Sequence, residues 1–327
     1  MTERFLLALC FALCSISALA APLTEKDAYA LAAKAAKGDL KAGNELERLA
    51  KAGEPMAQRF MGRLYSSGQG VPRNDEYAIE WYRKAAEQGD LLSMHNVAVM
   101  YARAPGKLRN TAEALKWFRA AADKGYAPSQ SNLAYMLIEG DGTAQDLPEA
   151  KSWLDKAVAQ KEPYGEYLLG DMYLHGRGVD KDIAQGARLL GRAAEAGLRE
   201  AQFQLGLMYR DGVGVEKSDA SALEWLRKSA DQRYPNAQYV LFGVYWRGSL
   251  GVKRDKAKGL VWLQRSANQN FAPAQFQLGL LYANGDGVEK DDRQAYAWMV
   301  EAAKNGSAEA AAFVKRIDSQ SNSKDAK

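Results

Sequence analysis

The sequence predicts an all-α protein, an α-solenoid of helix–turn–helix repeats with a period of 36 residues. Three observations support this fold class. Tryptophan recurs at a fixed spacing, tyrosine recurs 16 residues before it, and a Gly-x-Gly turn separates the two rows. Self-similarity at a period between about 20 and 50 residues is typical of solenoids and other repeat arrays, whose units bury their apolar faces only by stacking.

The tryptophan row defines the period. Its members follow one another at steps of 36, 36, 72, 37 and 36 residues: Trp81, Trp117, Trp153, Trp225, Trp262 and Trp298. Leu189 occupies the position that the step of 72 leaves open. The preceding row is mostly tyrosine: Tyr65, Tyr101, Leu137, Tyr173, Tyr209, Tyr245 and Tyr282. Agreement at so many positions predicts seven copies of one unit.

Each unit is expected to contain two helices. The first begins near a proline, as at Pro55, Pro163 and Pro235, and proline is favoured in the first turn of a helix. Its end is marked by the Gly-x-Gly turn. The second carries a small residue, the tryptophan and an Ala-Ala or Ser-Ala pair at helical spacing. Small residues three positions before the tyrosine and the tryptophan predict that the two helices approach closely. Large Trp and Tyr side chains are expected to fill the layer between units.

Repeat six departs from this pattern. The step of 37 places one inserted residue in Ser249–Leu250, in a loop. Phe242 stands where other repeats have Gly or Ala, and Trp246 is the only tryptophan outside the main row. Gly243 lies between Tyr239 and Trp246 on one helix face and predicts a slot for a partner side chain. The alternative is that Phe242 displaces its neighbours and Trp246 fills the resulting gap.

The N-terminus has the pattern of an export signal, predicted as residues 1–20. Arg4 precedes an apolar run, and Ala18-Leu19-Ala20 is a small-x-small cleavage site. An uncleaved anchor and a lipoprotein are the alternatives. Because Cys10 and Cys14 are the only cysteines, the mature chain would contain no disulfide. No second long apolar run occurs, so we expect no stable membrane insertion after cleavage and a periplasmic or secreted protein.

The remaining organisation follows from the repeat pattern. Residues 21–53 are expected to form an N-terminal helical cap with a degenerate repeat, in which Glu45 takes the tryptophan position. Residues 54–306 hold the seven repeats, residues 307–317 a C-terminal capping helix, and residues 318–327 a disordered tail. A polar terminal unit is what a solenoid requires where its stack meets water.

Composition and motifs exclude several classes of function. Lys plus Arg number 44 and Asp plus Glu number 40, and a net charge of +4 predicts no nucleic-acid partner. Two histidines, His95 and His175, are 80 residues apart, so we expect no metal site and no cofactor. Neither H-E-x-x-H nor G-x-S-x-G occurs. The Gly-x-Gly turns lack the third glycine of a nucleotide-binding loop and follow a helix rather than a strand.

The unit resembles a known family. The stretch from Ala201 to Tyr209, like the stretch from Ala274 to Tyr282, matches the Ala-x-x-x-Leu-Gly-x-x-Tyr signature of the Sel1-like repeat (SLR) family, a relative of the tetratricopeptide repeat. The turn and the Ala-x-x-Trp-x-x-x-Ala-Ala-x-x-Gly segment continue this similarity. The resemblance implies a right-handed superhelix that serves as a scaffold for protein–protein interaction.

The resemblance also implies which residues face a partner. The first helices of such repeats line a concave surface, and positions six and two before the tyrosine and one after it point inward. The candidate partner-binding residues are Tyr167, Asp171, Phe203, Arg210, Tyr239, Trp246 and Phe276. The alternative is that the aromatic residues at the first of these positions pack only against the next repeat.

The predicted function is therefore that of an exported, non-enzymatic scaffold or adaptor, which binds a partner protein or peptide along its concave surface. Two alternatives stay open: a hydrolase acting on β-lactam or cell-wall substrates, and a secreted factor that engages host proteins. Some cysteine-rich members of the family carry a β-lactamase label, but they have a disulfide in each repeat and this sequence has none.

Overall fold

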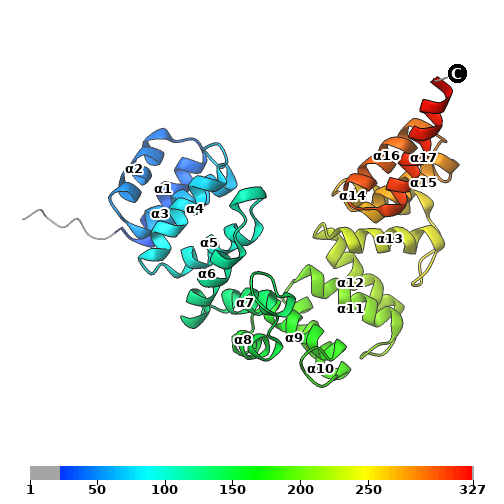
Figure 1. Cartoon of the computed structure of the whole chain (residues 1–327). Helices are drawn as coiled ribbons and strands as arrows, with labels where there is room; N and C mark the ends of the chain where they lie inside the picture. Colours follow the sequence, from blue (N-terminus) through cyan, green and yellow to red (C-terminus); the bar gives the residue numbers. More distant parts are fainter. Residues whose placement is uncertain (1–22, 326–327) are drawn as a thin grey trace, which may run out of the picture. The chain divides into compact units, whose positions relative to one another are not determined.

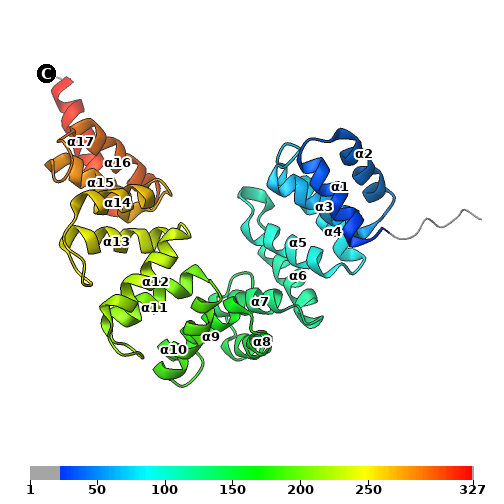
Figure 2. The same ribbon diagram turned by 180° about the vertical axis from the view of Figure 1, so that it is seen from behind.

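The computed structural model describes residues 23–325, in which helices are joined by short turns (Figures 1 and 2). The predicted export signal, residues 1–20, lies outside these described residues. Contacts within the chain divide it into two compact units, one ending at Trp117 and the other beginning at Phe118. Every regular element of the described residues is a helix, which confirms the all-α prediction.

The first unit contains α1 (Glu25–Ala36), α2 (Leu40–Lys51), α3 (Pro55–Ser67), α4 (Asp75–Glu87), α5 (Leu91–Arg103) and the 3₁₀ helix η1 (Gly106–Leu108). The boundary between the units lies within α6 (Thr111–Asp123). The second unit contains α7 (Ala127–Glu139), α8 (Leu147–Ala159), α9 (Pro163–His175), α10 (Ile183–Glu195), α11 (Arg199–Asp211), α12 (Asp219–Asp231), α13 (Pro235–Arg247), α14 (Lys256–Ala267), α15 (Ala272–Asn284), α16 (Asp292–Lys304) and α17 (Ala308–Asp325).

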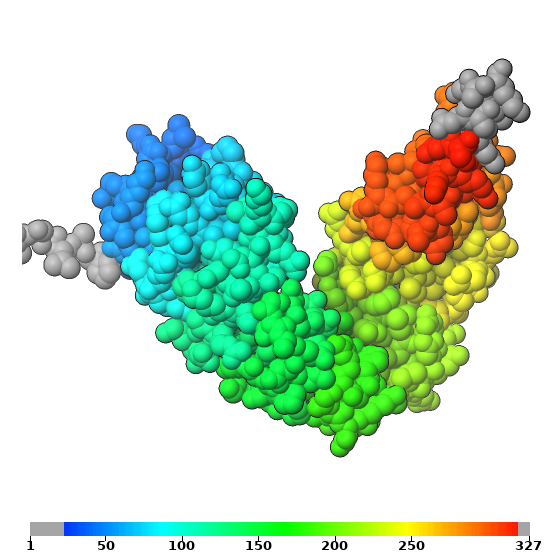
Figure 3. Space-filling view, viewed as in Figure 1, coloured from blue at the N-terminus to red at the C-terminus, as the bar shows by residue number. Residues whose placement is uncertain are grey.

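From α3 to α16, odd-numbered helices are the first helices of the seven repeats and even-numbered helices are the second. In the second unit each helix from α7 to α17 packs against the next one along the chain. In the space-filling view, segments of this unit that are neighbours in sequence are accordingly also neighbours on the surface (Figure 3). This is the nearest-neighbour packing of a solenoid.

The helix ends follow from local sequence. Proline occupies the first or second position of α3, α7, α9, α13 and α15, where its missing N–H has no helical partner to lose. The same five helices and α11 end at a left-handed glycine, as at Gly212. Second helices begin at a side-chain cap, as at Ser218, whose hydroxyl accepts from the Ser221 N–H.

The deepest core row lies one residue after the tryptophan row. Leu154, Leu226 and Leu263 are fully buried, whereas Trp225 is only half-buried. Successive helical residues point about 100° apart, so only one of the two can face the first helix directly. The indole lies at the edge, where Lys228 Nζ covers the Trp225 ring at 4.0 Å from its centroid. Trp81, Trp117 and Trp153 are nevertheless buried, as the sequence predicted, and Trp225 packs against the cluster that contains Leu190 and Leu205; the residue after the tryptophan is the more deeply buried of the two.

Glycine lets the two helices of a repeat approach each other. A Cβ placed on Gly206 of α11 would lie 2.9 Å from Leu226 Cγ and 3.1 Å from the Leu226 backbone nitrogen on α12. A Cβ on Gly62 of α3 would similarly lie 2.8 Å from the Tyr82 ring of α4. These distances are too short for a real contact, so the small residue is a packing requirement.

A row of buried glutamine side chains connects consecutive repeats. Gln202 of α11 donates its amide to the carbonyl of Ala194, at the end of the preceding second helix, at 3.1 Å. Its own Oε1 accepts from Gln232, at the end of α12, at 2.8 Å. The same pair of hydrogen bonds occurs at Gln58, Gln130, Gln238 and Gln275. Each buried amide is therefore satisfied while it ties three helices together.

The two ends of the array differ from the repeats. In α2, Glu45 is partly exposed and pairs with Arg48 at 2.7 Å, as expected for a polar terminal unit. The prediction of a disordered segment from residue 318 is wrong for most of its length, because α17 continues from Ala308 to Asp325. That stretch contains neither glycine nor proline, and Asp318 accepts a hydrogen bond from the Tyr296 hydroxyl at 2.6 Å. No helix of the described residues is long and apolar enough to span a membrane.

Candidate partner-binding surface

The seven candidate residues all lie on first helices of the second unit. Tyr167 and Asp171 belong to α9, Phe203 and Arg210 to α11, Tyr239 and Trp246 to α13, and Phe276 to α15. Each of them is half-buried. We call this set the first-helix face.

The aromatic residues at the first position pack against the next repeat. The ring of Phe203 meets Tyr234, the residue before α13, edge-to-face at a centroid distance of 5.4 Å. Tyr239 meets Phe271, the residue before α15, in the same way at 5.8 Å. The packing alternative that the sequence left open is thus what these two rings show, and only their remaining edges are available to a partner.

The same contact is polar in earlier repeats. Arg59, the corresponding residue of α3, pairs with Asp90 before α5 at 3.1 Å. Ser131 of α7 donates a hydrogen bond to Glu162 before α9. The two partners are 31 residues apart in both pairs, and 31 or 32 residues apart in the aromatic pairs. In each pair both residues are polar or both are aromatic, and this sequence signal was missed. The paired residues therefore link one repeat to the next.

Tyr167 and Phe276 are also held by apolar neighbours. Tyr167 packs against the core cluster that includes Leu205, with Leu198 beside it. Burial, and secondarily the nearby Asp171 carboxylate, raises the pKa of Tyr167 to about 12, so its phenol stays protonated in neutral solution. Phe276 packs against the last core cluster, which contains Met299 and Ala310.

The two charged candidates are neutralised within their own repeats. Asp171 lies 3.1 Å from His175 Nδ1 and 3.7 Å from an Arg177 guanidinium nitrogen. Arg210 forms two hydrogen bonds of 2.7 Å with Asp211, and this pairing holds the pKa of the Asp211 carboxyl below its usual range. Neither side chain therefore offers a free charge to a partner.

The residues by which repeat six differs from the other repeats line one cavity of about 280 Å³. Its lining joins α11, α13, α15 and the loop that carries the insertion: Arg210, Tyr239, Val240, Phe242, Gly243, Val244, Trp246, Arg247, Ser249, Leu250 and Gln277. Gly243 lines this cavity, but the space directly over it is taken by the Arg247 guanidinium. The inserted Ser249–Leu250 segment, which the sequence placed in a loop without a role, forms part of the cavity wall.

Packing accounts for two of these departures. Phe242 is buried in the cluster that contains Leu263 and Leu278, and its ring lies 5.2 Å from that of Trp246. A Cβ on Gly287, in the turn of the next repeat, would lie 2.6 Å from Trp246 Cη2. Trp246 thus packs against that turn and forms a fixed wall of the cavity, as the repacking alternative proposed.

Arg247 is the residue of this site that the sequence reasoning did not single out. It is exposed at the end of α13, and its guanidinium lies over Gly243, where a Cβ would be 2.7 Å from Nη2. Among the described residues it forms no hydrogen bond or ion pair with a carboxylate. A glycine one turn before an arginine was the available signal, since only the missing side chain lets the guanidinium lie against the helix.

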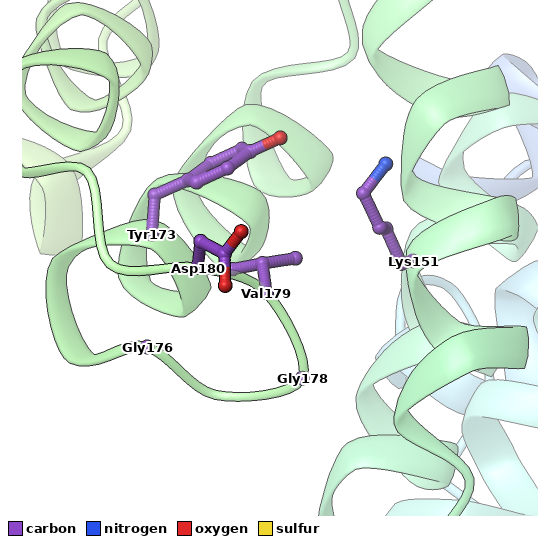
Figure 4. A pocket seen from close by; sticks show the side chains of 6 residues that line it. All are labelled: Lys151, Tyr173, Gly176, Gly178, Val179 and Asp180. Atoms are coloured by element: carbon purple, nitrogen blue, oxygen red, sulfur yellow. The ribbon is translucent and has the colours of Figure 1, made fainter.

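A second hollow, of about 680 Å³, lies between α8 and the turn that follows α9 (Figure 4). Lys151 faces it from α8, while Tyr173 and Asp180 face it from the other side (Figure 4). Gly178 has φ +70°, and a Cβ there would lie 2.6 Å from Leu147 Cβ. The glycine therefore serves the close approach of the turn to α8. Lys151 is paired with Asp155 at 2.8 Å, and the hollow contains no buried polar group.

The two histidines occupy different settings. Burial, together with the nearby Arg103, lowers the pKa of His95 on α5 to about 4. His175 is exposed at the end of α9 and contacts Asp171. Among the described residues, no group of three or more His, Cys, Asp or Glu side chains is arranged to hold a metal ion.

Comparison with known proteins identifies the repeat. The Sel1 repeat model matches residues 55–90, 91–126, 127–161, 163–198, 199–234, 235–271 and 272–307. No curated protein matches the chain.

Two solved structures are similar along most of the chain. A Sel1 repeat protein from Oxalobacter formigenes is 30% identical with a TM-score of 0.61, over 90% of this chain and 86% of that one. A protective antigen of uropathogenic Escherichia coli strains, described as having an SLR fold, is 31% identical with a TM-score of 0.59, over 90% of this chain. This chain spans 64% of the antigen's length.

A more distant structure shares the fold alone. Yeast Tom70 is 13% identical with a TM-score of 0.52, over 91% of this chain and 61% of that one. The seven matched repeats, together with the two structures at 30% and 31% identity, show that the chain belongs to the Sel1 repeat family.

Proposed function

We propose that this protein is an exported, non-enzymatic scaffold that binds a partner protein or peptide on the first-helix face of its second unit. The observation that carries the proposal is the cavity of repeat six. Several residues that break the repeat pattern line this one cavity. Sel1 repeat proteins are commonly interaction scaffolds, which agrees with this role.

The surface around the cavity is suited to binding without rearrangement. Phe203 and Tyr239 are fixed by rings of the next repeat, and Trp246 is fixed by the turn at Gly287. Side chains that are already ordered lose little conformational entropy when a partner arrives. Half-buried aromatic residues of this kind are also the usual anchors of protein interfaces.

Export is the second part of the proposal. It rests on the apolar run after Arg4 and on the cleavage site Ala18-Leu19-Ala20, which predict a mature chain that begins at Ala21 in the periplasm or outside the cell. Intact-mass measurement of protein recovered from the periplasmic fraction tests this. A full-length form that retains Met1 in the membrane fraction would contradict it.

Site-specific photo-crosslinking in intact cells tests the binding surface. A photo-reactive residue at Gln277, on the wall of the cavity, should trap a partner protein as a discrete adduct. The control is Val261 on α14, which is more exposed than the half-buried Gln277 and lies on a second helix. Adducts at Val261 equal to those at Gln277, or none at Gln277, would refute binding on the first-helix face.

A further inference from the structure

The cavity of repeat six combines an aromatic wall with a cation that has no carboxylate partner in the part of the chain that the structure describes. Tyr239, Phe242 and Trp246 supply the aromatic side, and the guanidinium of Arg247 lies at its edge against Gly243. The other arginine of the lining, Arg210, is already neutralised by Asp211. Arg247 is therefore the charge of this site that a partner can pair.

The size of the cavity limits what can enter. About 280 Å³ lies just below the range of roughly 300–1,000 Å³ that is typical of pockets for whole small molecules. It equals the volume of roughly nine liquid waters at about 30 Å³ each, which suits one bulky side chain. An aromatic lining favours an apolar or aromatic side chain, since its burial removes apolar surface from water on both partners.

The surroundings of the cavity are strongly basic. The stretch 247–258 contains five cations and one carboxylate, and one of the cations, Lys256, is paired with Asp286 of the next repeat, which leaves a net charge of +3. The single acid, Asp255, is already used, because it caps α14 and accepts from the Lys258 N–H at 2.9 Å. A net positive charge beside a cavity that has an aromatic wall is complementary to an acidic segment that carries an apolar side chain.

We propose that the repeat-six cavity binds an acidic peptide segment by taking up one large apolar side chain, while a neighbouring Asp or Glu carboxylate of that segment pairs with Arg247. This rests on the proposed function and names the chemistry of the partner. An anionic lipid surface would use the cations but leave the cavity empty, so the cavity favours a peptide.

Selection of short random peptides displayed on phage tests the proposal with the full mature chain as bait. Enriched peptides should carry Asp or Glu within two residues of Phe, Trp, Leu or Met. No enrichment at all would overturn the proposed function itself. Enriched peptides without an acid–apolar pair, or preferential binding to vesicles of anionic phospholipid, would overturn only the partner chemistry.

Charge reversal then locates the site. Arg247→Glu should weaken binding of an enriched peptide about tenfold or more, the effect of losing a hydrogen bond between charged groups. The matched control is Arg103→Glu, which makes the same charge change at the equivalent exposed position of α5, in repeat two. Equal losses in the two variants would show a general charge effect and would overturn the assignment to this cavity.

A second variant tests the slot without weakening the fold. Gly243→Ala places a methyl group 2.7 Å from the present position of Arg247 Nη2, so the flexible guanidinium must move away. We expect several-fold weaker peptide binding with an unchanged or higher melting temperature. Unchanged affinity in this variant would contradict the proposed position of the carboxylate.

Discussion

The close approach of α11 and α12 can be tested by adding a single methyl group. Gly206→Ala would place its Cβ 2.9 Å from Leu226 Cγ and 3.1 Å from the Leu226 backbone nitrogen. Neither atom is the free end of a flexible side chain, and Leu226 is fully buried. The two helices must therefore move apart, and overpacking of this kind typically costs about 1–3 kcal/mol.

Helix propensity acts in the opposite direction. Alanine is favoured over glycine inside a helix by roughly 0.5–1 kcal/mol. The net expectation for Gly206→Ala is thus a loss of about 1–2 kcal/mol in the free energy of unfolding. Gly191→Ala on α10 is the matched control, because nothing lies within 4 Å of a Cβ at that position. Its expected result is a gain of roughly 0.5–1 kcal/mol.

Urea denaturation followed by far-UV circular dichroism measures both changes. Because a repeat array can lose individual repeats before it unfolds completely, amide hydrogen exchange in α11 and α12 should accompany it. The reasoning would be refuted if Gly206→Ala stabilised the protein as much as Gly191→Ala does. Repeat three carries Ala134 at the equivalent position, so an alanine there is compatible with the repeat itself.

Three further predictions follow from burial and charge. Ser93→Ala should raise the free energy of unfolding by about 1 kcal/mol in urea titrations, because the Ser93 hydroxyl is buried without a hydrogen-bond partner. Leu226→Ala should cost about 3–4 kcal/mol by the same assay, and more than Trp225→Ala, because Leu226 is fully buried and Trp225 is not. The pKa of His95 is lowered to about 4, so the unfolded chain binds more protons between pH 4 and 6.5 and stability falls as pH drops through this window. Urea titrations at pH 7 and pH 4 give the free energy of unfolding that is lost on acidification. This loss should be smaller in His95→Gln than in the parent by up to roughly 3 kcal/mol.

The fold could be predicted from the sequence because its determinants repeat. Prolines and glycines mark helix ends through backbone geometry, which a single residue decides, and small residues mark the close helix contacts. The deepest row was misplaced because size suggested Trp225, whereas helix geometry favours the next residue, Leu226. The extension of α17 past Ile317 was missed because polar composition suggested disorder although no helix-breaking residue is present.

The candidate surface was predicted less completely because its residues act in pairs. That Phe203 packs against Tyr234, or that Asp211 neutralises Arg210, depends on contacts between different repeats or on one rotamer. A pattern of single positions does not contain this information. The 31-residue pairing could have been found by asking whether two positions change polarity together from one repeat to the next.

Substitution of Arg247, rather than of Trp246, can distinguish a role in binding from a role in packing. Equivalent positions in the other units show what packing alone requires, and Trp246 meets such a requirement by filling the space above Gly287. Trp246→Ala would therefore disturb stability and binding together, and its effect on affinity would identify neither role. Arg247 is exposed and pairs with no carboxylate among residues 23–325, so its replacement removes no ion pair of the described structure. A loss of peptide affinity that is larger in Arg247→Glu than in Arg103→Glu, with an unchanged melting temperature, has recognition at this cavity as its cause.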